Sequence, residues 1–96
     1  MNICFITARI LDNPQRIFRE DNYITLMKIS FPYKRKLLCY AKCIAYNRIG
    51  QNIFDLYFKG DYIIIEGKLV IAKNNGIKGL LININNIHPA HIIMQK

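Results

Sequence analysis

Residues 59–70, Lys-Gly-Asp-Tyr-Ile-Ile-Ile-Glu-Gly-Lys-Leu-Val, decide the fold of this chain. The β-branched and aromatic run at 62–65 favours a strand, and Gly60 in front of it supplies the positive φ that commonly ends a helix. Gly67 interrupts the strand pattern, which indicates a bulge or a sharp bend. We therefore predict a helix closed by Gly60 and a strand that bends at Gly67, as a small closed barrel needs because its strands must curl.

Turn signals and periodicity divide the rest of the chain. Asp-Asn-Pro at 12–14 breaks the first apolar run, Pro32 ends the second, and Asn-Asn-Gly at 74–76 is a strong hairpin signal. Residues 15–22 fit either a return strand or a loop. The predicted elements are strands at 3–10, 23–31 and 37–46, an amphipathic helix at 48–59, and strands at 62–73 and 77–87.

This order of three strands, one helix and two strands is that of the OB-fold, a five-stranded Greek-key barrel with a helix between strands three and four. We therefore predict an all-β fold with one short helix. One domain is expected over residues 1–89, and residues 90–96 are expected to form a C-terminal tail, since they carry no periodic pattern. In OB-folds the second and third strands commonly form the oligonucleotide-binding face.

The third predicted strand, residues 37–46, alternates most clearly, and successive side chains of a strand point to opposite faces. The apolar and mostly small face, suited to a tightly curved core, collects Leu37, Cys39, Ala41, Cys43 and Ala45. The other face carries Tyr40 and Tyr46 on either side of Lys42. Aromatic rings that stack on bases, beside a cation that meets phosphates, are typical of a surface that binds single-stranded nucleic acid.

The charge distribution points to the same class of ligand. The formal charge is +8, from 14 basic and 6 acidic residues, which favours nucleic acid first and an anionic membrane surface second. A solvated basic surface is the alternative, because the 19 isoleucines, ten asparagines and nine lysines match A/T-rich codons. The candidate nucleic-acid-binding residues, four of them at a predicted hairpin tip at 33–36, are Phe31, Tyr33, Lys34, Arg35, Lys36, Tyr40, Lys42, Tyr46 and Arg48.

Catalytic, metal-binding and membrane roles find little support. The chain has one serine, two threonines and only two histidines, His88 and His91, near its end, too few for a plausible nucleophile with its base. Cys4, Cys39 and Cys43 lack metal-binding spacing, so we expect reduced core thiols. No apolar run approaches the roughly 18 residues that span a bilayer. We predict a non-enzymatic protein with no cofactor, no metal and no small-molecule substrate.

Four stretches of the sequence are similar to one known family. Residues 2–14 match its opening strand and proline turn, 24–26 its second strand, and 43–48 the strand that enters its helix. Residues 56–69, a helix end followed by Gly, strand residues, Glu-Gly and a basic residue, match its most recognisable motif. The chain therefore resembles, over roughly residues 2–89, the bacterial-type single-stranded-DNA-binding proteins, including the small versions found in plastid genomes.

The resemblance implies that Tyr40 and Tyr46 fall where the family places stacking aromatics, and Lys42 where it places a base. It also implies a homodimer or homotetramer, built through pairing of first strands and of larger sheet faces, in a plastid or a bacterial cytoplasm. The chain departs from the family in having no tryptophan, in carrying Asn74 near an expected stacking aromatic, and in lacking a glycine-rich segment with an acidic tip.

We expect sequence-tolerant binding of single-stranded DNA that supports replication or repair. Two alternatives stay open. One is an OB-fold assembly subunit of a replication-restart or other nucleoprotein complex with weak or no affinity for DNA, which the missing tryptophan and tail favour. The other is an RNA-binding OB-fold, which nothing in the sequence excludes. We also expect self-association, because isoleucines occupy both faces of several strands and exceed what one small core can enclose.

Overall fold

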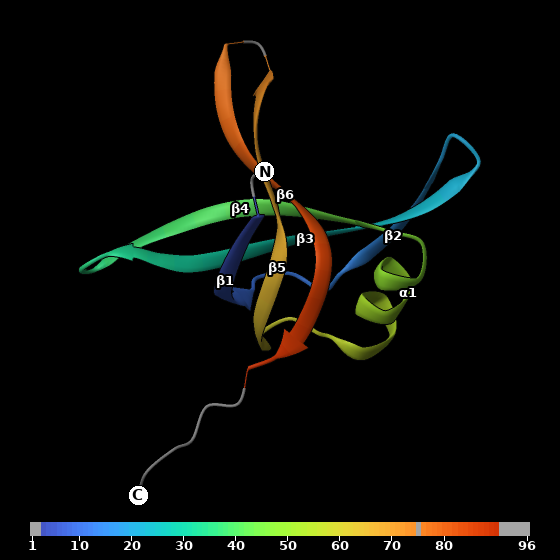
Figure 1. Cartoon of the computed structure of the whole chain (residues 1–96), viewed down its shortest axis with the longest axis horizontal. Helices are drawn as coiled ribbons and strands as arrows, with labels where there is room; N and C mark the ends of the chain where they lie inside the picture. Colours follow the sequence, from blue (N-terminus) through green and yellow to red (C-terminus); the bar gives the residue numbers. More distant parts are fainter. Residues whose placement is uncertain (1–2, 75, 91–96) are drawn as a thin grey trace, which may run out of the picture.

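The computed structural model describes residues 3–74 and 76–90 and shows a β-barrel with one helix at its side (Figure 1). The elements are the strands β1 (Ile3–Ile10), β2 (Gln15–Arg19), β3 (Asn22–Lys34) and β4 (Leu37–Tyr46), the helix α1 (Asn47–Leu56), and the strands β5 (Tyr62–Asn74) and β6 (Ile77–Pro89). The predicted all-β class with a helix after the strand at 37–46 is confirmed. Within the described residues, no helix has the length and apolarity needed to cross a bilayer.

Five of the strands close into a barrel. The sheet runs in the order β1-β5-β6-β4-β3-β2, and an additional pairing of β1 with β3 closes the first five of these strands into a ring. One edge of β3 serves two partners, since residues 22–26 pair with β2 whereas Ser30 and Ile29 pair with Arg9 and Ile10 of β1. The parallel pairing of β4 with β6 completes the Greek key. The strand β2 is therefore an addition outside the five-stranded barrel, formed by residues that the sequence left undecided between strand and loop.

The bend predicted at Gly67 is confirmed, and its cause is the close approach of β6. Glu66 pairs with Asn86 but Gly67 pairs with Ile84, so Asn85 is an extra residue on the opposite strand. A Cβ at position 67 would lie 2.5 Å from the carbonyl oxygen of Asn83, closer than any real contact. Glycine is therefore required where the register of the two paired strands shifts and the sheet curls into the barrel.

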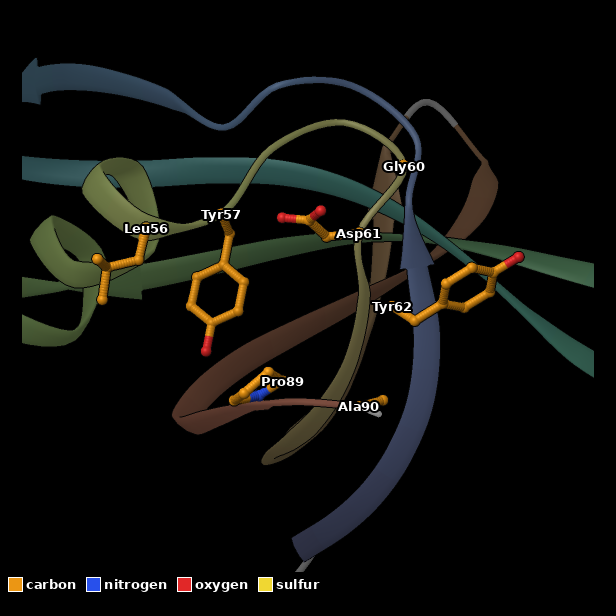
Figure 2. A pocket seen from close by; sticks show the side chains of 7 residues that line it. All are labelled: Leu56, Tyr57, Gly60, Asp61, Tyr62, Pro89 and Ala90. Carbon is orange, nitrogen blue, oxygen red and sulfur yellow. The ribbon is translucent and has the colours of Figure 1, made fainter. Parts of the chain in front are cut away.

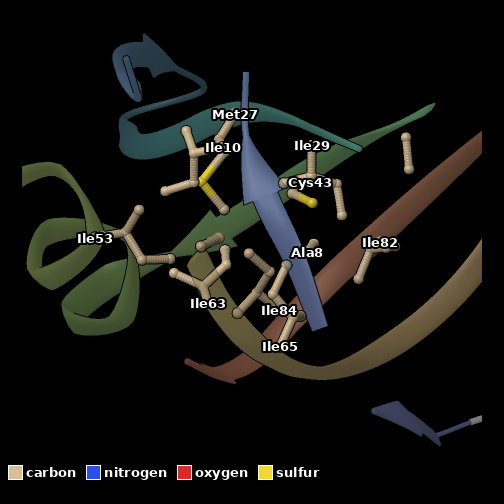
Figure 3. Packing of buried hydrophobic residues seen from close by; sticks show 12 residues of the cluster. Ala8, Ile10, Met27, Ile29, Cys43, Ile53, Ile63, Ile65, Ile82 and Ile84 are labelled. Atoms are coloured by element: carbon tan, nitrogen blue, oxygen red, sulfur yellow. The ribbon is translucent and has the colours of Figure 1, made fainter. Parts of the chain in front are cut away.

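The core fills the barrel with isoleucine side chains from every strand of the closed sheet except β4, which contributes small residues (Figure 3). Its buried members are Ala8, Ile10, Met27, Ile29, Ala41, Cys43, Ala45, Ile53, Ile63, Ile65, Ile82 and Ile84. Ile53 comes from α1 and is completely buried, so the apolar face of the helix packs against the core of the barrel. The hydroxyl of Thr25 donates to the carbonyl oxygen of Gly50 at 2.7 Å and ties the helix to β3.

Two predicted boundaries were wrong by three residues, and the others differ by two residues or fewer. The helix ends at Leu56, and Gly60 lies in the following turn with φ +93°, where its amide donates to the carbonyl oxygen of Ile10 at 2.8 Å. The positive φ was correctly placed, but it serves a loop that binds β1. Pro32 does not end its strand either, because β3 continues to Lys34. Beyond Ser30, β3 pairs with β4 alone, and the register of this pairing shifts after Pro32. Because proline has no backbone N–H to donate, it is tolerated at a strand edge or a bulge such as this one.

The three cysteines are free, but only Cys43 is buried as predicted, whereas Cys4 and Cys39 are half-buried. Leu37, placed on the same face by parity, is 55% exposed because the β3–β4 hairpin extends past the barrel. Parity alone identifies a face, and the length of the barrel decides how much of that face is covered.

Burial raises the pKa of the Cys43 thiol from 9.0 to about 12, with a smaller contribution from Cys4. The unfolded chain therefore releases this proton first as the pH rises, so the free energy of unfolding should fall between about pH 9 and pH 12, by at most about 4 kcal/mol from this group. Denaturant unfolding at a series of pH values measures it. Cys43→Ala should flatten the dependence, and an unchanged slope would contradict the assignment to this thiol.

Candidate nucleic-acid interface

The outer face of β3 and β4 presents the predicted aromatic and basic side chains to solvent. Residues directly opposite each other on antiparallel strands share a face, and the register places Ser30 opposite Tyr40 and Ile24 opposite Tyr46. The side chains of Tyr40 and Tyr46 are 63% and 45% exposed. We call this surface, formed by Ile24, Leu26, Lys28, Ser30, Tyr40, Lys42, Ile44 and Tyr46, the β3–β4 outer face.

Lys28 and Lys42 lie directly opposite each other in the middle of this face, and both are exposed. Like charges at opposed positions of a β-sheet destabilise it. A bound phosphate would remove that repulsion and gain two charge-assisted contacts. Lys28 was missed as a site residue because the sequence shows only that it lies in an acid-free window. Its position against Lys42 depends on the β3–β4 register, which local sequence does not reveal.

The basic residues of the predicted hairpin tip lie where expected. Lys34 ends β3 and Arg35 and Lys36 form the turn, all of them exposed. Lys36 takes the positive φ of 62° that closes the hairpin. The β3–β4 hairpin projects from the barrel as an arm (Figure 1), and Leu38 adds an exposed aliphatic side chain to it. The arm thus extends the β3–β4 outer face with positive charge.

Two of the predicted residues do not join this face, and a third cannot be assigned to it. Phe31 is opposite Cys39 and packs against the buried core, so parity directs it to the inner side of β3. Arg48 is exposed in the first turn of α1, beyond the end of β4. The backbone of Tyr33 lies in β3, and its side chain is outside what the structure describes. The face therefore carries Tyr40, Lys42 and Tyr46 of the predicted set.

A hollow beside the end of the helix is lined by Leu56, Tyr57, Gly60, Asp61, Tyr62, Pro89 and Ala90 (Figure 2). Partial burial, together with the nearby charge of Asp61, raises the pKa of Tyr57 and keeps the phenol neutral. The Asp61 carboxylate accepts a hydrogen bond from the amide of Phe58 at 2.8 Å, which caps the turn. No group of three or more metal-ligating side chains occurs in the described residues, which exclude His91.

Comparison with solved structures shows that the fold of this barrel is a known one. It superimposes on the SSB domain of a Synechococcus protein with a TM-score of 0.80 at 23% identity, covering 92% of this chain and 94% of the other. For a small single-stranded DNA-binding protein of Streptomyces coelicolor the TM-score is 0.78 at 10% identity, covering 92% and 91% of the two chains. At such low identity these matches establish the fold, so the predicted OB-fold is confirmed.

Comparison of sequences extends the likeness beyond the fold. No family model matches the chain. The Porphyra purpurea protein ycf41, provisionally named a single-stranded DNA-binding protein, is 35% identical over 82 residues, which cover 84% of this chain and 73% of the relative. Since that identity extends over most of both proteins and the barrel is shared with bacterial SSB domains, the chain belongs to the single-stranded-DNA-binding protein family of ycf41.

Proposed function

We propose that this protein is a non-enzymatic, sequence-tolerant binder of single-stranded DNA that supports DNA replication or repair in a plastid or a bacterial cytoplasm. The observation that carries the proposal is the β3–β4 outer face, on which two exposed tyrosines flank an opposed pair of lysines. Membership in the family of ycf41 supports the same ligand. The two alternatives, a nucleoprotein assembly subunit and an RNA binder, are tested by the experiments below.

The chemistry of this face accounts for tolerance of sequence. Tyr40 and Tyr46 offer flat rings, and every base has a π-face that can stack on them. Lys28 and Lys42 meet the phosphate backbone, which is the same for all sequences. The face has no tryptophan. Affinity should therefore rest on two tyrosine stacks, each contributing about 1–3 kcal/mol, and on phosphate contacts that salt weakens.

The deciding experiment is retention of the wild-type chain on immobilised oligo-dT, with free oligo-dT, oligo-rU and duplex DNA as competitors, over a series of salt concentrations. We expect the chain to bind oligo-dT with a logarithm of the affinity that falls linearly with the logarithm of the salt concentration. Duplex DNA should compete poorly for this binding. Absence of retention at low salt would contradict the proposal and favour the assembly subunit. Stronger competition by oligo-rU than by oligo-dT would instead favour the RNA-binding alternative.

Replacing Lys28 by glutamate should have opposite effects on the free protein and on the complex. The new carboxylate pairs with Lys42, so the melting temperature at low salt should rise. The affinity for oligo-dT should fall, and the salt slope should flatten by at least about 0.7, the value for one phosphate contact on a single strand. Lys68→Glu on β5 is the control, because it makes the same change in net charge away from this face. Equal loss in both variants would indicate a general charge effect.

We also propose that the protein is a homo-oligomer, a homodimer or a homotetramer. Within the described residues, β1 pairs with β3 only at Arg9 and Ile10, so the rest of one edge is open. The outward side chains beside that edge include Ile3 and Phe5, which are 46% and 71% exposed. An open strand edge and an exposed apolar surface are both features that a second copy can cover.

Light scattering at micromolar protein concentration tests self-association. We expect a mass of at least twice the 11.3 kDa of one chain. Phe5→Lys should lower that mass without unfolding the barrel, because the side chain is exposed in the single subunit and a buried lysine is costly in an interface. A wild-type mass near that of one chain would contradict the proposal.

A further inference from the structure

A row of four directly paired residues crosses the outside of the barrel at right angles to its strands. Tyr40 on β4 is opposite Ser30 on β3, Ser30 is opposite Arg9 on β1, and Arg9 is opposite Tyr62 on β5. Opposed residues of antiparallel strands share a face, so all four side chains belong to one surface. We call this set the Tyr40–Tyr62 row. It begins on the β3–β4 outer face and ends three strands away.

The far end of the row repeats the chemistry of its near end. The guanidinium carbon of Arg9 lies 5.8 Å from the ring centroid of Tyr62, which is a cation–π distance. Arg9 is exposed and Tyr62 is 44% exposed. Figure 2 shows the Tyr62 ring directed across β1, whereas Tyr57 and Asp61 lie on the other side of the β5 backbone. An exposed ring with a cation beside it is a stacking platform next to a phosphate contact.

The surroundings leave the Arg9 charge available for a ligand. In the described part of the chain no carboxylate lies within ion-pair distance of Arg9, and the nearby Asp61 accepts its hydrogen bond from Phe58. Gly60 has no side chain to cover the guanidinium, and even a Cβ there would only reach ordinary contact distance, 3.9 Å from a guanidinium nitrogen. Between the two tyrosines, β3 contributes only the small, buried side chain of Ser30, so no bulky side chain of β3 blocks the row.

We propose that Arg9 and Tyr62 form a second binding site for the same strand of DNA, which runs from Tyr40 over Ser30 to Tyr62. The inference rests on the proposed function and adds to it a route across the strands and two residues. Neighbouring strands lie about 4.8 Å apart, so the row spans about 14 Å. That length suits a few nucleotides, within the roughly 4–16 that one OB-fold binds. Tyr62 stacks on a base, and Arg9 both contacts phosphate and holds the ring.

The absence of tryptophan makes a direct test possible, because Tyr62→Trp and Tyr40→Trp each introduce the single tryptophan of the chain. Base stacking quenches indole emission. With oligo-dT of about 16 nucleotides, both variants should be quenched. With a thymidine dinucleotide, which is too short to span the row, Tyr40→Trp should be quenched more than Tyr62→Trp, because the β3–β4 outer face is occupied first. Phe58→Trp, an exposed position off the row, is the control and should keep its emission.

The outcomes separate this inference from the proposed function. Quenching of Tyr40→Trp but not of Tyr62→Trp by the longer oligomer would overturn the second site and leave DNA binding intact. Quenching of neither, together with no retention on oligo-dT, would refute the proposed function itself and the second site with it. Emission of Tyr62→Trp that shifts with protein concentration in the absence of DNA would show the face to be a contact between two copies of the chain, which also overturns the second site.

Substitution of Arg9 gives an independent readout. Arg9→Gln should flatten the salt slope for the longer oligomer by about 0.7 and leave the slope for the shorter one unchanged. Arg9→Lys should restore most of the slope, because it keeps the charge. The melting temperature checks that the barrel is intact. An Arg9→Gln slope equal to that of the wild type for the longer oligomer would overturn the phosphate contact.

Discussion

Replacing Tyr40 by alanine is expected to lower the affinity for oligo-dT by about tenfold or more, since one base–aromatic stack contributes about 1–3 kcal/mol. The melting temperature should hardly change. Tyr40 is 63% exposed, and the residue opposite it is the small Ser30, so little packing is lost. Filter binding and thermal unfolding of the same preparation measure both effects. A large fall in melting temperature would instead make Tyr40 a structural residue.

Leu38→Ala is the matched control, because Leu38 lies two residues away on the same side of β4 and is 57% exposed. It should change affinity little, since an aliphatic side chain offers no ring to a base.

Tyr46 differs from Tyr40 because it precedes α1 and is opposite the buried Ile24. For that position Tyr46→Phe, which keeps the ring, should retain binding, whereas Tyr46→Leu should lose it. Equal binding by these two variants would contradict stacking at Tyr46.

The largest expected effect on stability follows Gly67→Ala, which should lower the free energy of unfolding by about 3 kcal/mol or more. The added methyl group would meet the carbonyl oxygen of Asn83 at 2.5 Å and the Ile82 side chain at 3.0 Å. A backbone atom cannot rotate away, so β5 and β6 must separate where their register shifts. Urea unfolding measures the loss.

Gly79→Ala on β6 is the control for this prediction. It makes the same chemical change in the same hairpin, yet nothing lies within 4 Å of the added methyl group. Its stability should equal that of the wild type or exceed it slightly, because alanine restricts the unfolded chain. Similar losses in both variants would show that the hairpin tolerates no side chain in general, and would contradict the specific role of the close approach at Gly67.

The sequence by itself determined the features that depend on a few neighbouring residues. The strand Leu37–Tyr46 was predicted with its observed bounds, because its alternation is uninterrupted and a hairpin tip and a helix flank it. Its side-chain parity correctly separated Ala41, Cys43 and Ala45 inside from Tyr40 and Lys42 outside. The bend at Gly67 was also predicted, because a single glycine within a run of strand-forming residues usually marks a bulge or a bend.

The turn between β2 and β3 shows why other features were not predictable. Glu20 and Asp21 both adopt positive φ, at 51° and 63°. Such a two-residue turn usually contains asparagine and glycine, so the sequence carries no signal for it. Pairing of β2 along β3 holds the turn in this conformation. Positive φ costs a non-glycine residue about 1–2 kcal/mol, and several cross-strand pairs together offset that cost.

Only the tertiary structure decided which residues from distant parts of the chain meet. Lys28 is opposite Lys42 because of the β3–β4 register, and Arg9 is opposite Tyr62 because β1 pairs with β5. A shift of either register by one residue would move these side chains to the other face, without changing any local sequence preference. The outward position of Tyr40 and Lys42 on β4 was therefore predictable from the sequence, whereas the residues opposite them depended on how the barrel closes.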